Sequence, residues 1–231
     1  MKLHRFYVQD IDLPHDFWLQ DEALFHQWVR VLRFKVDREL VLFNNKQKEK
    51  LYAISKIGDN AVHLKLVTDM QGKRPQNNVY LCFSLLKKDK SDWVLQKSTE
   101  LGVSHFVPLI TARTEKTGFS IERAQKIVRE AAEQCGRVDI PRVRDPITLK
   151  KVVSELEHKA TLFVAEQGPH VSDIKLQISQ QVPIAVLIGP EGGWTDEEKD
   201  LFVQKDIQHV SLSQFTLRAE TAAVAAATLF A

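Results

Sequence analysis

The chain has 231 residues, 44% of them hydrophobic, which is enough for one large domain or two small ones. Its formal net charge of +2 is too small to identify a nucleic-acid partner, because affinity for phosphate depends on local clusters of basic residues. No apolar run approaches the roughly 20 residues needed to span a bilayer, and no signal-peptide core opens the chain, so we expect a cytoplasmic protein.

The two cysteines give no sign of a metal centre. Cys82 and Cys135 share no metal-ligand spacing with the histidines. We expect buried free thiols, no disulfide framework and no bound metal.

The first seventy residues are expected to form mostly strands. Short apolar or alternating runs at 6–8, 39–43, 51–54 and 62–66 are separated by turn residues. One helix over 22–33 interrupts them, with Asp21 as its N-cap. Short strands with tight turns predict a small barrel.

A polar, turn-rich segment at 71–78 marks a change of pattern, and we divide the chain there into domains 1–72 and 73–231. Beyond it, strands and helices alternate, which predicts an α/β domain with a mainly parallel sheet. The strands are expected at 79–86, 105–110, 161–165, 184–188 and 210–212, and the helices at 93–101, 121–135, 149–156, 196–204 and 219–230. Thr195 and Glu198 form a capping box at the start of one helix.

A glycine-rich loop follows the apolar run at 185–188. Residues 189–193 read Gly-Pro-Glu-Gly-Gly, so the backbone can approach a flat ligand such as adenosine closely. Ligands in α/β sheets bind beyond the carboxyl ends of the strands, which is where this loop lies. A tight turn without function is the alternative. The loop lacks the motifs of phosphate-binding loops and dinucleotide folds.

A second segment, residues 217–222, reads Leu-Arg-Ala-Glu-Thr-Ala and opens a helix rich in small residues. The helix could simply press on the sheet, with Glu220 complementing the helix dipole. Its arginine and glutamate, Arg218 and Glu220, are also candidates for chemistry.

Together with residues 99–103 and 130–137, these two segments resemble the ribosomal RNA small subunit methyltransferase E family in order and spacing. The resemblance runs nearly end to end, and residues 4–6 and 26–33 also fit it. It departs at 212–217, where the family usually reads Leu-Gly, a variable residue, Arg and an aliphatic pair. This change puts the local loop shape and one RNA contact in question.

The resemblance implies an N-terminal PUA-like β-barrel and a C-terminal SPOUT domain with a trefoil knot. It also implies a homodimer that transfers a methyl group from S-adenosylmethionine to N3 of a uridine in 16S ribosomal RNA, either as free RNA or in the assembled small subunit. Carried over position by position, with the strand residues beside them, the methyl-donor site is expected at Leu187, Ile188, Gly189, Pro190, Glu191, Gly192, Gly193, Ser211, Leu212, Leu217, Arg218, Ala219 and Thr221.

The reaction needs a base for the N3 proton and no covalent intermediate. Glu220 is the first candidate for the base, followed by Glu191 and Glu100. Arg218 keeps its proton, so it is expected to stabilise the uracil oxygen that gains charge, or to hold a phosphate. The expected catalytic set is Arg218, Glu220 and Glu191.

Basic residues outside the donor motifs are candidates for RNA contacts. We assign Arg5, Arg30, Arg33, Lys35, Lys97 and Arg137 to this role, with Lys46, Lys48 and Lys50 as a further cluster. An ordinary solvated surface is the alternative, and Lys97 could pair with Glu100 on one helix. His63, in an alternating strand, is expected to be structural.

Three rival functions stay open. The chain could be a non-catalytic RNA-binding module, which failure to bind the methyl donor would indicate. It could methylate another RNA position, or act on a small nucleotide-like substrate without RNA.

Overall fold

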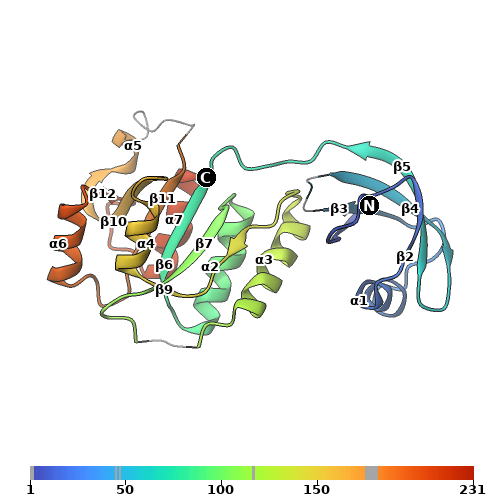
Figure 1. Ribbon diagram of the computed structural model, residues 1–231, viewed down its shortest axis with the longest axis horizontal. Helices are drawn as coiled ribbons and strands as arrows, with labels where there is room; N and C mark the ends of the chain where they lie inside the picture. Colours follow the sequence, from blue (N-terminus) through green and yellow to red (C-terminus); the bar gives the residue numbers. More distant parts are fainter. Residues whose placement is uncertain (1–2, 45, 47, 116–117, 175–181) are drawn as a thin grey trace. The chain divides into compact units, whose positions relative to one another are not determined.

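The computed structural model describes residues 3–44, 46, 48–115, 118–174 and 182–231 (Figure 1). It divides into two compact units, one of Met1–Arg74 with Ala132–Ile140 and the other of Pro75–Ala131 with Pro141–Ala231. Sequence patterns gave no sign that residues 132–140 group with the N-terminal unit. This segment is the end of one helix and the loop after it, which no composition shift marks.

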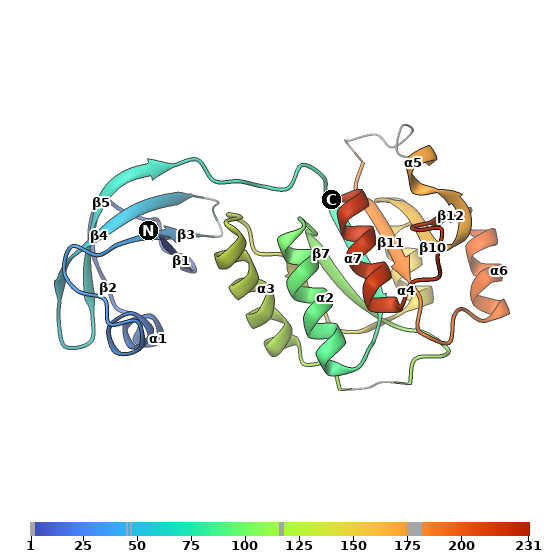
Figure 2. The ribbon, with the colours of Figure 1, turned by 180° about the vertical axis from the view of Figure 1, so that it is seen from behind.

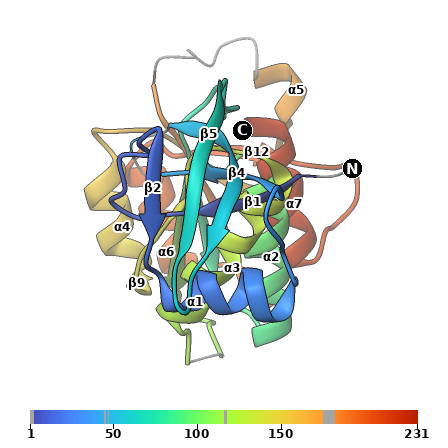
Figure 3. The same cartoon turned by 90° about the vertical axis from the view of Figure 1, so that its right-hand side faces the viewer.

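The N-terminal unit is built on a five-stranded sheet in the order β1-β3-β4-β5-β2. Strands β2, β4 and β5 of this sheet can be followed in Figure 3. The strands are β1 (His4–Tyr7), β2 (Asp16–Leu19), β3 (Glu39–Phe43), β4 (Glu49–Ile57) and β5 (Val62–Met70). Among the described residues, β1 and β3 pair in parallel and the other neighbouring strands pair antiparallel. Strand β2 was not predicted, because four residues give too short a pattern.

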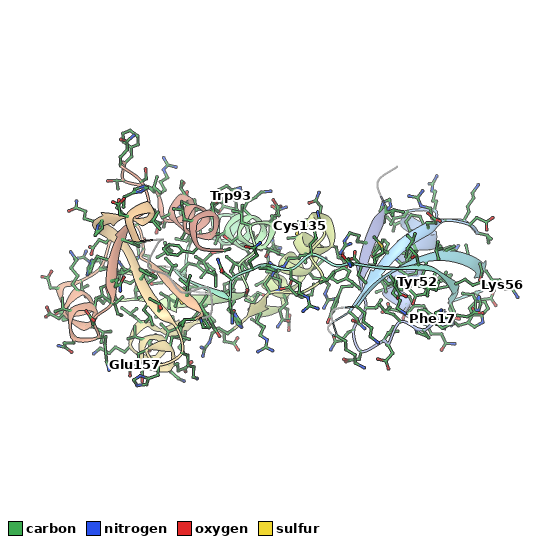
Figure 4. The ribbon with its side chains drawn as sticks, turned by 90° about the horizontal axis from the view of Figure 1, so that it is seen from above. Phe17, Tyr52, Lys56, Trp93, Cys135 and Glu157 are labelled. Carbon is green, nitrogen blue, oxygen red and sulfur yellow. The ribbon has the colours of Figure 1, made fainter. Side chains whose placement is uncertain are left out.

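The core of this unit is rich in aromatic residues. Trp28 and Tyr52 are completely buried, and the rings of Phe17 and Tyr52 meet edge to face at 5.6 Å (Figure 4). The hydroxyl of Tyr52 donates to the carbonyl of Pro14 at 2.7 Å, so its polar end is satisfied inside the core. His63 is structural, as predicted: its ring contacts the Ser55 hydroxyl and pairs with Asp16.

The predicted helix over 22–33 has two parts. Asp21 caps α1 (Glu22–Phe25), accepting a hydrogen bond from the Leu24 amide at 2.9 Å. The chain then widens into the π-helix η1 (His26–Val31), after which the Leu32 amide donates to Gln27. An apolar spacing of three and four residues cannot distinguish these two hydrogen-bond patterns, so the π-helix was missed.

The C-terminal unit contains the parallel sheet that the alternating pattern predicted. Its strand order is β12-β10-β11-β6-β7-β8, with β9 also paired to β7, and all of these strand pairs are parallel. The strands are β6 (Val79–Ser84), β7 (His105–Ile110), β8 (Arg142–Val143), β9 (Ile147–Thr148), β10 (Thr161–His170), β11 (Ile184–Ile188) and β12 (Gln208–Ser211).

Helices cover both faces of this sheet (Figure 2). They are α2 (Lys88–Glu100), α3 (Ile121–Cys135), α4 (Leu149–Leu156), α5 (Val171–Ile174), α6 (Asp196–Gln204) and α7 (Ala219–Phe230). Helix α7 packs on α2, β6 and β11, whereas α4 and α6 share an apolar core with the other face. The capping box of Thr195 and Glu198 is confirmed at the start of α6. No described helix is both long and apolar enough to cross a membrane.

Candidate active site

A cavity of about 700 Å³ lies beside the last part of β10 and at the carboxyl ends of β11 and β12. Because these strands are parallel, the segments that follow them meet at one edge of the sheet, the usual position for a ligand in α/β folds. The cavity is lined by four stretches of chain, residues 165–168, 188–191, 193–194 and 211–219, together with Ala222. Both segments that the sequence singled out therefore contribute to one site.

The glycine-rich loop leaves β11 against a buried indole. A Cβ atom at Gly189 would lie 2.9 Å from the Trp194 ring, so a side chain there has no room. Trp194 is itself held edge to face against Phe202 at 5.1 Å. Gly193 has φ +70°, a conformation that favours glycine, and its amide donates to the Pro190 carbonyl. The loop is thus a rigid wall of the cavity.

The wall formed by β10 was not predicted from the sequence. Strand β10 continues to His170, five residues beyond its expected end, and brings 165–168 to the cavity. A Cβ atom at Gly168 would lie 2.8 Å from the carbonyl oxygen of His209 on β12. Glu166 in this wall pairs with Lys199 and His209, each at 3.3 Å. The isolated Gly168 in a strand was the one available signal of close backbone approach.

The loop between β12 and α7 is the part that departs from the family pattern. The Ser211 hydroxyl donates to the Ser213 carbonyl, and the Ser213 hydroxyl accepts from the Phe215 amide. These bonds turn the loop over the cavity, while the Phe215 side chain is 72% exposed. Arg218 is the exposed N-cap residue of α7 and lines the cavity.

Arg113, in the segment after β7, secures the glycine-rich loop from outside. Its guanidinium Nη1 donates to the carbonyls of Gly192 at 2.6 Å and Trp194 at 3.3 Å. The neighbouring amide of Ala112 donates to Glu198 of α6 at 2.9 Å. Sequence reasoning missed this arginine, because only the fold brings β7 and β11 to the same edge.

A charged group adjoins the cavity beside this loop. The Lys90 ammonium on α2 lies 3.4 Å from the Glu191 carboxylate and 3.2 Å from Glu220 on α7. The hydrogen bond that the Lys90 ammonium donates to Glu220 is the largest cause that raises the pKa of Lys90, so the ammonium stays charged. The other Glu220 oxygen, Oε2, is buried and has no hydrogen-bond partner among the described residues. Lys90 was not predicted either.

The structure sorts the predicted donor-site residues into two groups. Those that line the cavity are Ile188, Gly189, Pro190, Glu191, Gly193, Ser211, Leu212, Leu217, Arg218 and Ala219. Leu187, Gly192 and Thr221 do not: Leu187 is buried within β11, Gly192 contacts Arg113, and Thr221 lies on an exposed part of α7. Glu220 does not line the cavity either, but Lys90 connects it to Glu191, which does. Glu100 pairs with Lys97 instead, as the sequence allowed.

Two of the predicted RNA contacts are engaged inside the N-terminal unit. The Arg137 side chain is 6% exposed and forms an ion pair with Asp139 at 2.5 Å. Arg5 pairs with the buried Glu49 and donates to the Arg137 carbonyl. We therefore withdraw both arginines as RNA contacts, because Arg5 is paired with the buried Glu49 and the buried Arg137 is paired with Asp139.

The remaining basic candidates for RNA contacts differ in exposure and in whether they form an ion pair with an acidic residue. Arg30, Arg33 and Lys35 are exposed, and the latter two line a groove of about 480 Å³ in the N-terminal unit. Lys46 and Lys50 pair with Asp12 and Asp69, and Lys97 with Glu100.

Neither thiol supplies a nucleophile to the cavity. Cys82 is completely buried, and burial raises its pKa to about 12, so it is not a thiolate near neutral pH. Cys135 is exposed at the end of α3 (Figure 4), which corrects the expectation that both thiols are buried. No group of three or more His, Cys, Asp or Glu suited to a metal ion occurs in the described part of the chain.

Family models identify the class of protein to which this fold and cavity belong. Residues 73–231 match the family model described as an RNA methyltransferase domain, and residues 29–67 match that of the RNA methyltransferase PUA domain. Ribosomal RNA small subunit methyltransferase E of Rickettsia conorii is 31% identical over 98% of this chain and 94% of its own length. The chain belongs to the ribosomal RNA small subunit methyltransferase E family.

Solved structures are also consistent with membership of this family. A methyltransferase of Legionella pneumophila, solved with bound S-adenosylmethionine, has a TM-score of 0.87 and 28% identity, covering 100% of this chain and 97% of that one. The family member from Neisseria gonorrhoeae, also bound to S-adenosylmethionine, has a TM-score of 0.86 and 26% identity, covering 98% and 96%.

Proposed function

We propose that this protein transfers the methyl group of S-adenosylmethionine to N3 of a uridine in 16S ribosomal RNA. The observation that carries the proposal is a glycine-walled cavity at the carboxyl edge of the sheet, with a lysine and two glutamates beside it. The names and bound ligands of the relatives support both the donor and the class of RNA.

The residues present fit this donor. A cavity of about 700 Å³ is within the usual range for a small-molecule site. Gly168 and Gly189 let the backbone pack against His209 and the Trp194 ring, where a side chain would collide, and so allow two walls of the cavity to form. We assign the donor site to the lining residues, adding Trp194 and residues 165–168 and removing Leu187, Gly192 and Thr221.

When bound, the donor supplies an electrophilic methyl carbon attached to a positively charged sulfur. The protein then has to orient the uracil and remove its N3 proton. Glu220 accepts that proton as a carboxylate. Arg218, at the cavity and at the N-terminus of α7, stabilises the uracil oxygen that gains negative charge. Neither cysteine lies at the cavity, so a covalent route through a cysteine nucleophile is not open to it.

We propose that the exposed Arg30, Arg33 and Lys35 contact the RNA backbone, because they supply positive charge beside an open groove. Arg33→Ala is expected to weaken binding and to reduce the salt slope by about one, since one phosphate contact is lost. Filter binding at several salt concentrations measures both. Lys56→Ala removes an exposed charge elsewhere in the same unit (Figure 4) and serves as the control. If both variants had the same salt dependence of RNA binding, the RNA-binding surface would lie elsewhere.

We also propose a homodimer in the cytoplasm, with the trefoil knot that the family resemblance implies. Trp93 on α2 is 42% exposed (Figure 4), which leaves a large apolar ring available for a second copy. The small residues of α7 are used within the chain, where they pack on α2 and the sheet. Light scattering is expected to give twice the 26.5 kDa chain mass. A fully active monomer would contradict the dimer.

The function is tested by transfer of labelled methyl from S-adenosylmethionine. Small ribosomal subunits and free 16S RNA, both from cells without this enzyme, are supplied as alternative acceptors. Label in either acceptor supports the proposal and identifies the better substrate. RNA binding without any transfer would instead indicate a non-catalytic module.

A further inference from the structure

The charged group beside the cavity is assembled from three separate segments. Lys90 comes from the first turns of α2, Glu191 from the loop after β11, and Glu220 from the first turn of α7. The ammonium nitrogen lies 3.2 Å from Oε1 of Glu220 and 3.4 Å from Oε1 of Glu191. One cation is thus shared by two carboxylates that differ in exposure, 15% for Glu220 and 53% for Glu191.

Proton transfer changes the charge balance of this group. At rest, two carboxylates and one ammonium carry a net charge of −1. When Glu220 accepts a proton it becomes neutral and can no longer balance the ammonium. The Lys90 side chain is only 26% exposed, and an unpaired charge in such a position is unfavourable. Glu191 is already next to Lys90, so the ammonium stays paired with one carboxylate after the proton transfer.

The two oxygens of Glu220 also have different surroundings. Oε1 is next to the ammonium, whereas Oε2 is buried without a hydrogen-bond partner among the described residues. A buried carboxylate oxygen without a hydrogen bond is unfavourable, so any arrangement that brings a hydrogen-bond donor to Oε2 is stabilised. Because Lys90 is also paired with Glu191, the Glu220 side chain can turn toward an incoming N–H group without leaving the ammonium alone. The other charged residue at this end of α7 is Arg218, two positions earlier.

We propose that Lys90 is a positioning residue for the base Glu220, and that Glu191 keeps the ammonium paired while Glu220 carries the proton. The inference rests on the proposed function. In the step it describes, the N3–H bond breaks and the proton bonds to a Glu220 oxygen. The N3 electron pair forms the new bond to the methyl carbon, and the carbon–sulfur bond breaks with its electrons staying on sulfur.

Single-turnover methylation at saturating donor and ribosomal subunit tests this assignment. Lys90→Gln is expected to be about 30-fold slower, the effect of losing one hydrogen bond to a charged group. Lys90→Arg keeps the charge and should recover most of the rate. Glu191→Gln alone should be slower than wild type, but Lys90→Gln/Glu191→Gln should be no slower than Lys90→Gln, because without the ammonium Glu191 has nothing to balance. Lys88→Gln, an exposed lysine of the same helix, is the control.

Calorimetry with S-adenosylmethionine and thermal unfolding complete the experiment. We expect Lys90→Gln to bind the donor like wild type and to remain folded. A wild-type rate in Lys90→Gln, additive losses in the double variant, or a rate loss explained by weaker donor binding would each overturn the assignment. If Lys90→Gln does not fold, Glu191→Gln decides, because its half-exposed side chain can be changed without unfolding, and an unchanged rate overturns the inference. A wild-type protein that does not modify N3 would instead overturn the proposed function.

Discussion

Glu220→Gln is expected to slow methyl transfer about 10³-fold near neutral pH, because a positioned base contributes about 10²–10⁴-fold and an amide cannot accept the N3 proton. Glutamine keeps the size of the side chain and can still contact Lys90, so the structure should be preserved. The rate should recover in part as rising pH ionises the uracil without help. Single-turnover rates on saturated complexes across a pH series measure this profile.

Arg218→Lys is the matched comparison on the same helix. It keeps the positive charge but loses the planar fork of the guanidinium, so we expect a rate reduced by about 10²-fold at every pH, as for loss of an oxyanion donor. The two variants should therefore differ in the shape of their pH profiles. Parallel profiles would contradict the division of roles between Glu220 and Arg218.

Gly189→Ala is expected to weaken binding of S-adenosylmethionine by up to about 100-fold, because overpacking a rigid site costs about 1–3 kcal/mol. The new Cβ atom would lie 2.9 Å from the Trp194 ring, which is buried and held against Phe202. To relieve this contact either the loop or the indole must shift, and both line the cavity. Calorimetry with the donor alone measures the loss.

Gly192→Ala provides the control within the same loop. Its Cβ atom would lie 3.3 Å from Cδ of the exposed Arg113 side chain, a contact that a small shift of that chain relieves, and Gly192 does not line the cavity. The affinity should therefore change much less than in Gly189→Ala. Equal losses in both variants would mean that the whole loop, and not the wall at Gly189, determines donor binding.

The fold was largely predictable because its signals are local. The buried run at 184–188, the glycines after it and the capping box of Thr195 define a strand, a loop and a helix without any tertiary information. The alternation of strands and helices then predicts parallel pairing, which the structure confirms. The π-helix at His26–Val31 was missed because an apolar spacing of three and four residues does not distinguish its hydrogen-bond pattern from that of an α-helix.

The site was predictable only where its residues form a motif. Residues 188–191 and 217–219 line the cavity as expected. Lys90, Arg113 and Glu166 reach the site through the strand order of the sheet, which the sequence does not encode as a pattern. Arg137 was misassigned for the opposite reason: its charge suggested a surface contact, but the fold buries it beside Asp139.

The most direct test of the proposed chemistry is to map the modified atom. Small ribosomal subunits from cells without this enzyme are treated with the protein and S-adenosylmethionine, and the 16S RNA is digested to nucleosides and fragments for mass spectrometry against synthetic standards. The mechanism with Glu220 as base predicts 3-methyluridine at a single position. Methyl groups on the ribose 2′-oxygen or on C5 of uridine, with no 3-methyluridine, would contradict it.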